Sequence, residues 1–266
     1  MFLYTLVLAL LFGPRLVLCE SNDTWEFLMF TQIWAPSVCV VSNEKSPGTC
    51  LYPKQLDTWT VHGLWPSRFK GGEGPQFCHT PQRHFNESEI KDLETRLEIQ
   101  WPNLVKGKSK HSLWKHEWEK HGCCITNLTL LKGELNYFGH SLQLNKQYDL
   151  LGALKLHKIG PGDKSFNSDD VRKALYSDFK KKTELHCLKS SKTKSWYLSD
   201  IRVCLDKTLT PIDCPKNNSV AQGYGTPKPL PPVEPCPHDT PLFYPPFAHS
   251  KLARIFRLAA NLLYFL

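Results

Sequence analysis

Two short segments of the sequence hold side chains that are suited to catalysis. The first surrounds His62, and the second contains His116, Glu117, Lys120 and His121 within six residues. If the second segment is a helix with about 100° per residue, its four side chains fall within about 140° of one another. The sequence therefore predicts a helix face that carries two imidazoles, a carboxylate and an ammonium group.

Such a set of side chains is suited to acid–base chemistry. The pKa of an imidazole is about 6.5, so one histidine of a pair can accept a proton while the other donates one. RNA cleavage needs both steps, because the 2′-OH loses a proton and the 5′-oxygen gains one, and it needs stabilisation of an overcharged phosphorane. Two histidines and a lysine meet these needs without a metal. DNA lacks the 2′-OH, so the site would be specific for RNA.

Other catalytic classes fit the sequence less well. The second segment reads His-Glu-x-x-x-His, one residue longer than the zinc-protease motif, so its histidines stand too far apart on a helix to bind one ion. We therefore predict no metal and no cofactor, and a metal site is the alternative. The Gly-x-Ser-x-Gly motif of serine hydrolases is absent. Cys123 beside His121 suggests a thiol protease, but no supporting motif accompanies it.

The neighbouring residues predict the elements that position these segments. Residues 59–64 predict a strand that Pro66 ends, because proline cannot donate to a ladder. Residues 86–101 predict a helix, with Asn86 or Ser88 as its cap and apolar residues at three-to-four spacing. Short strands and segregated helices indicate an α+β fold. Further strands are expected at 25–41 and in a hairpin formed by 196–206 and Cys214, and further helices at 112–123, 138–151 and 168–185.

The N-terminal residues and four Asn-x-Ser/Thr motifs indicate the secretory pathway. Residues 1–19 are predominantly apolar, with Arg15 as the only charge, and resemble a signal peptide except that no basic residue precedes the apolar run. A buried N-terminal strand is the alternative. The expected glycan acceptors are Asn22, Asn86, Asn127 and Asn217.

The cysteine count is odd once that segment is cleaved. Ten cysteines less Cys19 leave nine, which allow four bridges and one free thiol in many connectivities. Two pairs close short loops that a hairpin could hold together, Cys39 with Cys50 and Cys204 with Cys214. Cys123 and Cys124 are adjacent, so we expect one of them to bridge elsewhere while the other stays reduced or couples to another chain.

Composition adds little to the functional prediction. The chain has 266 residues and 41% hydrophobic residues, enough for a packed core, and no apolar run long enough to span a bilayer. Its net charge of +8 is too small to indicate a polyanionic partner by itself. The C-terminal residues predict a basic amphipathic helix, which either packs on the domain or lies on a membrane surface.

The two histidine segments resemble the signature blocks of the ribonuclease T2 family. These blocks are residues 62–66, His-Gly-Leu-Trp-Pro, and residues 116–124, His-Glu-Trp-Glu-Lys-His-Gly-Cys-Cys. Similarity extends over about residues 25–246, through Gln-Ile-Trp at 32–34 and Phe-Tyr-Pro-Pro at 243–246. The resemblance implies an α+β fold around an antiparallel sheet, stapled by disulfides into one domain. The chain would then comprise a signal peptide at 1–19, a catalytic domain at 20–246 and a basic amphipathic helix at 247–266.

The resemblance also implies roles for single residues. His62 and His121 would form the acid–base pair, and we assign His121 as the base and His62 as the acid. The remaining implied roles are stabilisation of the phosphorane by Glu117 and Lys120, phosphate binding by His116, and base binding by Trp65 and Gln32. The implied disulfides are Cys39–Cys50, Cys78–Cys124, Cys187–Cys236 and Cys204–Cys214.

Together these observations predict an acid endoribonuclease that cleaves single-stranded RNA to a 2′,3′-cyclic phosphate. We expect a monomer that is secreted and is also found in lysosomes and the endoplasmic reticulum lumen. The alternative is a secreted glycoprotein of the same fold that acts by binding or signalling rather than by catalysis.

Overall fold

The computed structural model describes residues 24–70, 74–125, 127–215 and 232–248. The expected signal peptide, the expected glycan acceptors Asn22 and Asn217, and residues 249–266 of the expected C-terminal helix lie outside this part. The strands are β1 (Phe27–Ile33), β2 (Thr60–Ser67), β3 (Ser165–Asn167), β4 (Glu184–Lys189), β5 (Trp196–Leu205), β6 (Pro211–Ile212), β7 (Glu234–Pro235) and β8 (Pro241–Phe243).

Helices of both the α and the 3-10 type connect these strands. The α-helices are α1 (Ala35–Lys45), α2 (Glu94–Gln100), α3 (Lys110–Lys120), α4 (Glu134–Gln147), α5 (Leu150–Leu156) and α6 (Ser168–Phe179). The 3-10 helices are η1 (Glu87–Leu93), η2 (Gly122–Ile125) and η3 (Thr129–Leu131). In the described part of the chain, no helix is long and apolar enough to cross a bilayer.

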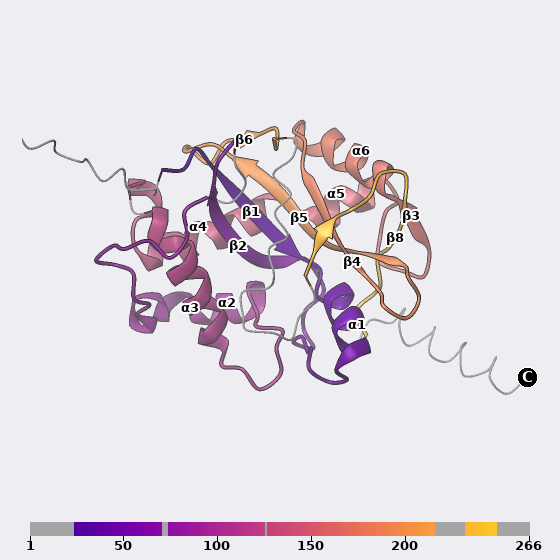
Figure 1. Ribbon diagram of the computed structural model, residues 1–266, viewed down its shortest axis with the longest axis horizontal. Coiled ribbons are helices and arrows are strands. Elements are labelled where there is room, and N and C mark those ends of the chain that lie inside the picture. Colours follow the sequence, from indigo (N-terminus) through magenta and orange to yellow (C-terminus); the bar gives the residue numbers. More distant parts are fainter. Residues whose placement is uncertain (1–23, 71–73, 126, 216–231, 249–266) are drawn as a thin grey trace, which may run out of the picture.

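All the strands join one sheet, whose main path runs β2-β1-β5-β4-β7 (Figure 1). The neighbours along this path are antiparallel. The predicted α+β class is confirmed, but the sheet is mixed rather than purely antiparallel, because β8 pairs with β5 in the parallel direction. Helices α2, α3 and α4 lie at one end of the molecule, and α5 and α6 lie at the other (Figure 1).

The sequence of β1 gives the sheet two different faces. Successive side chains of a strand point to opposite faces. Leu28 and Phe30 pack with residues of α2, α3 and α4 in one apolar cluster. Phe27 and Met29 pack on the other face with Trp65 of β2. The first histidine segment thus lies in a strand whose partner is buried on both faces.

The predicted strand at 59–64 is confirmed, but it does not end at Pro66. Strand β2 continues to Ser67, and Pro66 stands opposite Leu28 of β1. β2 lies at one end of the main path of the sheet and pairs with β1 alone there. An edge strand tolerates proline, because one side of it makes no ladder bonds.

Three predicted elements were wrong in extent. The apolar stretch 25–41 is not one strand, because helix α1 begins at Ala35 with a proline in its first turn, where the missing N–H costs no helical bond. The stretch 138–151 is divided between α4 and α5. The stretch 168–185 leaves the helix at Lys180, which has a left-handed backbone with φ 56°, and continues into β4.

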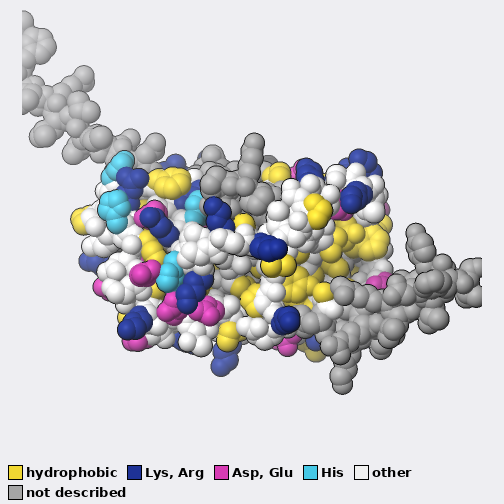
Figure 2. Space-filling view, turned by 90° about the horizontal axis from the view of Figure 1, so that it is seen from below, with side chains coloured by type: hydrophobic (Ala, Val, Ile, Leu, Met, Phe, Trp, Pro, Cys, Tyr) yellow, Lys and Arg dark blue, Asp and Glu magenta, His cyan; other side chains and the backbone are white. Residues whose placement is uncertain are grey.

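On the face seen in Figure 2, charged and histidine side chains gather towards the end built from α2, α3 and α4. Lys110 of α3 forms ion pairs there with Glu94 and Glu98 of α2. Hydrophobic side chains reach the surface mainly towards the opposite end (Figure 2).

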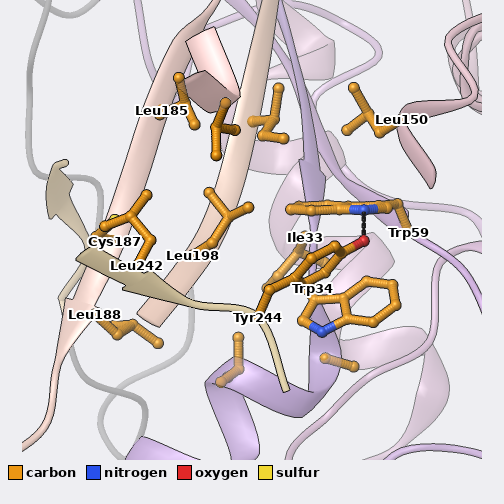
Figure 3. Close-up of a cluster of buried hydrophobic side chains, with 14 of the residues drawn as sticks. Ile33, Trp34, Trp59, Leu150, Leu185, Cys187, Leu188, Leu198, Leu242 and Tyr244 are labelled. Carbon is orange, nitrogen blue, oxygen red and sulfur yellow. Dashed lines mark hydrogen bonds between the residues drawn. The ribbon is translucent and has the colours of Figure 1, made fainter. Parts of the chain in front are cut away.

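An aromatic group fixes the segment that follows β8 onto the sheet. The indole of Trp59 donates a hydrogen bond of 2.7 Å to the hydroxyl of Tyr244, and the ring of Trp34 meets Tyr244 edge-on (Figure 3). Phe247 also packs on Trp34, with ring centroids 4.6 Å apart. Phe247 therefore packs with the core, and the expected start of the tail at residue 247 stays a prediction.

The disulfides implied by the resemblance are confirmed. Cys39 bonds Cys50, Cys78 bonds Cys124, Cys187 bonds Cys236 and Cys204 bonds Cys214. Among the described cysteines, Cys123 is the one outside a disulfide, and it is buried, so it is not available to another chain in this fold.

Candidate active site

The first histidine segment places His62 at an irregularity of the sheet. Thr31 of β1 pairs with Gly63, and Gln32 pairs with Val61, so His62 is the extra residue of a bulge. The imidazole is buried, and its Nδ1 lies 3.1 Å from Oδ2 of Asp200. Asp200 lies on β5. Because β1 lies between β2 and β5 in the sheet, this contact spans the width of β1.

The second segment meets the first at the C-terminal end of α3. Glu117 is 1% exposed, and its Oε2 accepts a hydrogen bond of 2.8 Å from the indole Nε1 of Trp65. His121 is the C-cap of α3, and its backbone N–H donates to the carbonyl of Glu117. The predicted helix thus holds the carboxylate and the second imidazole one turn apart.

The indole of Trp65 stands beside both imidazoles. Its ring centroid is 5.1 Å from that of His62 and 5.4 Å from that of His121. Gly63 makes this arrangement possible, because a Cβ there would overlap the indole nitrogen of Trp65 and the carboxylate of Glu117. The structure therefore brings the two predicted histidines together around one side chain.

Burial keeps the histidines of the second segment neutral. The pKa of His121 lies well below its usual value because of burial, reinforced by the charge of Lys120 and by His116 and His62 nearby. Burial and the same lysine lower the pKa of His116 to about 4. The Nε2 of His116 is buried and has no hydrogen-bond partner within the described residues. Burial has the opposite effect on Glu117 and raises the pKa of its carboxyl group.

Asp200 is the site residue that the sequence analysis missed. Burial opposes its charge, but the hydrogen bond from His62 and the charges of His62 and Arg202 hold its pKa below the usual value. Asp200 is therefore an ionised carboxylate. The signal that could have found it is an acidic and a basic residue two positions apart in an apolar strand, which places both on one face of the sheet.

The remaining predicted residues have mixed placements. Lys120, in the last turn of α3, is half-buried and close enough to lower the pKa of both neighbouring histidines. Trp65 is 2% exposed, and the guanidinium of Arg202 lies 5.4 Å from its ring centroid. Gln32 is 1% exposed, and its amide donates to the carbonyl of Tyr148 at 2.8 Å. Base binding by Trp65 and Gln32 stays a prediction, which requires these buried side chains to become accessible.

Two of the expected glycan acceptors lie in the described part and are exposed. The side-chain oxygen of Asn86 accepts a hydrogen bond from the backbone of Ser88 and caps η1. The side-chain oxygen of Asn127 accepts one from the indole of Trp25 at 3.2 Å. Among the residues that the structure describes, no group of three or more His, Cys, Asp or Glu side chains could hold a metal ion.

Comparison with known sequences identifies the family. Residues 25–214 match the Ribonuclease T2 family. The chain belongs to this family. It is 38% identical over 230 residues to Ribonuclease T2 protein rnst-2 of Caenorhabditis elegans, with 82% of this chain and 81% of that protein covered. It is 34% identical over 225 residues to Ribonuclease T2 of Sus scrofa, with 84% and 98% covered. The predicted family and its enzyme class are confirmed.

Solved structures give the same result for the ribonuclease T2 fold. The crystal structure of human RNase T2 aligns with a TM-score of 0.64 and 28% identity, over 84% of this chain and 99% of that one. RNase NT in complex with 5′-AMP aligns with a TM-score of 0.65 and 29% identity, over 84% and 100%.

Proposed function

We propose that this member of the ribonuclease T2 family is an endoribonuclease that cleaves single-stranded RNA to a 2′,3′-cyclic phosphate without a metal ion. The observation that carries the proposal is the environment of the two imidazoles. His121 is buried beside a cation, which holds its pKa well below the usual value, whereas Nδ1 of His62 lies 3.1 Å from the ionised carboxylate of Asp200. Such a difference between two histidines assigns one as base and the other as acid.

In the proposed reaction, neutral His121 takes the proton of the 2′-OH, and the 2′-oxygen attacks the phosphorus. The bond from phosphorus to the 5′-oxygen then breaks, and the imidazolium of His62 gives its proton to that oxygen. The products are a 2′,3′-cyclic phosphate and a free 5′-OH. His121 leaves the step protonated and His62 leaves it neutral, so the pair must exchange protons with water before the next turnover.

The other site residues would act on the phosphate. The ammonium of Lys120 offsets the charge that develops on the phosphorane. Glu117, whose pKa is raised by burial, can keep its proton in acid and donate a hydrogen bond to a phosphate oxygen. The unpartnered Nε2 of His116 is suited to bind a further oxygen. Trp65 and Gln32 would contact bases, and stacking on a tryptophan tolerates any base.

The proposed place of action is an acidic compartment of the secretory pathway. A base whose pKa is well below the usual value of a histidine stays neutral in acid, so His121 can accept a proton where an ordinary histidine would be blocked. We propose a secreted monomer that also acts in lysosomes and passes through the endoplasmic reticulum lumen, with glycans on its exposed acceptors. A weak contact of the C-terminal residues with a membrane surface is the remaining partner prediction.

Replacement of each histidine tests the mechanism. We expect His62→Ala and His121→Ala each to lower the rate of single-stranded RNA cleavage at least about 100-fold, the usual scale for loss of a general acid or base. His157→Ala, at an exposed histidine, is the matched control and should keep the full rate. A 2′,3′-cyclic product would identify the reaction, and EDTA should leave the rate unchanged. Undiminished cleavage by both variants would exclude this mechanism, and loss of activity in EDTA would indicate a metal.

A further inference from the structure

A row of buried ionisable side chains crosses one face of the sheet. It starts at His62 on β2 and continues through Asp200 and Arg202 on β5. The register of β4 and β5 sets Glu184 opposite Arg202 and His186 opposite Asp200. Residues two apart on a strand share a face, so these side chains lie side by side. Of these side chains, His62 alone belongs to the proposed acid–base pair.

The contacts of Asp200 fix its carboxylate in place. Oδ2 lies 3.1 Å from Nδ1 of His62, and Oδ1 accepts a hydrogen bond of 2.8 Å from the hydroxyl of Ser199. The side chain is wholly buried. A carboxylate can only accept hydrogen bonds, so Nδ1 of His62 must carry the hydrogen of this contact. The other ring nitrogen, Nε2, is then the one that can exchange a proton with a substrate.

The row holds further charged contacts beyond that of His62 with Asp200. Arg202 is a cation, and its charge helps to hold the pKa of Asp200 below the usual value. Glu184 lies within ion-pair distance of Arg202, at 3.7 Å, and 3.2 Å from Nε2 of His186. Burial lowers the pKa of His186, which is therefore neutral. Asp200 is thus a buried carboxylate, which is costly unless it is paired, and the ring of His62 contacts it at 3.1 Å.

Other ionisable groups also face His62. Helix α3 contributes Glu117 and His116, and the residue after it contributes His121. Burial keeps His116 and His121 neutral. Glu117 accepts a hydrogen bond from the indole of Trp65. Asp200 therefore supplies the direct carboxylate contact to His62 among these groups.

We propose that Asp200 is a positioning residue for His62, which fixes the ring with its hydrogen on Nδ1 and stabilises the imidazolium that protonates the leaving 5′-oxygen. Arg202 supports this role, because it balances the charge of Asp200 and lies against the ring of Trp65. The inference rests on the proposed function of His62 as the general acid. It adds a residue that lies 138 positions away in the sequence and does not touch the substrate.

Replacement of the carboxylate by an amide tests the proposal. The shape of Asp200→Asn is conserved, but its amide is neutral and can donate to Nδ1, which would move the ring hydrogen to Nε2. With a dinucleotide substrate we expect kcat to fall at least about 10-fold while KM changes little. The alkaline limb of the pH–rate profile, which reports loss of the proton from the general acid, should move to lower pH. Asp178→Asn, at an exposed aspartate of α6, should change neither.

A measurement on the unaltered chain covers the case in which Asp200→Asn does not fold. Nitrogen-15 NMR of labelled histidine should show neutral His62 with its hydrogen on Nδ1, with the signal assigned by its loss in His62→Ala. A hydrogen on Nε2 would overturn the proposal, as would a folded Asp200→Asn with an unchanged kcat and pH profile. If the unaltered chain itself does not cleave RNA, or if His62→Ala keeps the full rate, the proposed function fails instead.

Discussion

At the scale of single residues, the hydrogen bond from Trp65 to Glu117 is what joins the two histidine segments. Each segment belongs to a different element, and this buried bond ties the edge strand β2 to the end of α3. It is a charge-assisted bond when Glu117 is ionised and a neutral one when it is protonated, and both forms keep the indole between the imidazoles. Loss of the bond would therefore change the distance between acid and base rather than remove either group.

Substitution of Gly63 tests this dependence. In Gly63→Ala, the added methyl group would overlap both partners of the bond, so the indole or α3 must move. We expect kcat for RNA to fall at least about 10-fold, because a displacement of about 1 Å can cost that much or more. Gly139→Ala is the control, since its Cβ would meet Cδ1 of Leu93 at an ordinary contact distance of 3.9 Å. Equal rates for the two variants would show that the bond does not set the geometry.

At the scale of elements, the sequence predicted those helices and strands that the spacing of neighbouring residues determines. The helix that carries Glu117 and His121 and the strand that carries His62 were both predicted, because their signals lie within a few residues. The stretch 25–41 was misassigned, since a mostly apolar and mostly buried run shows no period that separates strand from helix. Asp200 was missed because its partner is 138 residues away, and only the pairing of β1 with both β2 and β5 brings them together.

The 3-10 helix η2 contains the thiol of Cys123, whose burial can be tested by chemical labelling. Cys123 is wholly buried, and its Sγ lies 3.1 Å from the carbonyl of Glu119 and 3.9 Å from Sγ of Cys124. We expect a thiol reagent to label Cys123 only after unfolding, because buried thiols react slowly. Labelling in urea should exceed that of Cys123→Ala by one group per chain, and labelling of the native forms should be equal. Rapid native labelling of Cys123 would show that η2 opens in solution.

At the scale of the whole molecule, buried ionisable groups make stability depend on pH in two opposite directions. The pKa values of His116, His121 and His186 are lowered by burial, so the unfolded chain binds protons that the fold does not. The stability that these groups contribute is present at pH values above their pKa in the unfolded chain, about 6.5, and is lost as the pH falls. The carboxyl groups whose pKa is raised by burial, Glu117 and Glu134, have the opposite effect, because the fold binds their protons more tightly than the unfolded chain does.

Glu134, at the start of α4, is a carboxyl group whose pKa is raised by burial. Its Oε1 accepts a hydrogen bond from the backbone of Asn86, while its Oε2 is buried without a partner in the described residues. Burial, with Glu89 and Glu119 nearby, raises its pKa from 4.5 to about 7. The folded state thus binds this proton more tightly, and the resulting stability is fully present below pH 4.5 and is lost as the pH rises through about 7.

Glu134→Gln should therefore remove one pH-dependent contribution. Between pH 5 and pH 7.5, the free energy of unfolding of the unaltered chain should fall relative to that of Glu134→Gln, by on the order of 1 kcal/mol after allowance for solvent screening. Urea unfolding of both proteins at each pH measures the difference. Asp163→Asn removes an exposed carboxylate and should run parallel to the unaltered chain. If Glu134→Gln also runs parallel, Glu134 is ionised in the fold, and the acid side of the stability curve is set by the histidines.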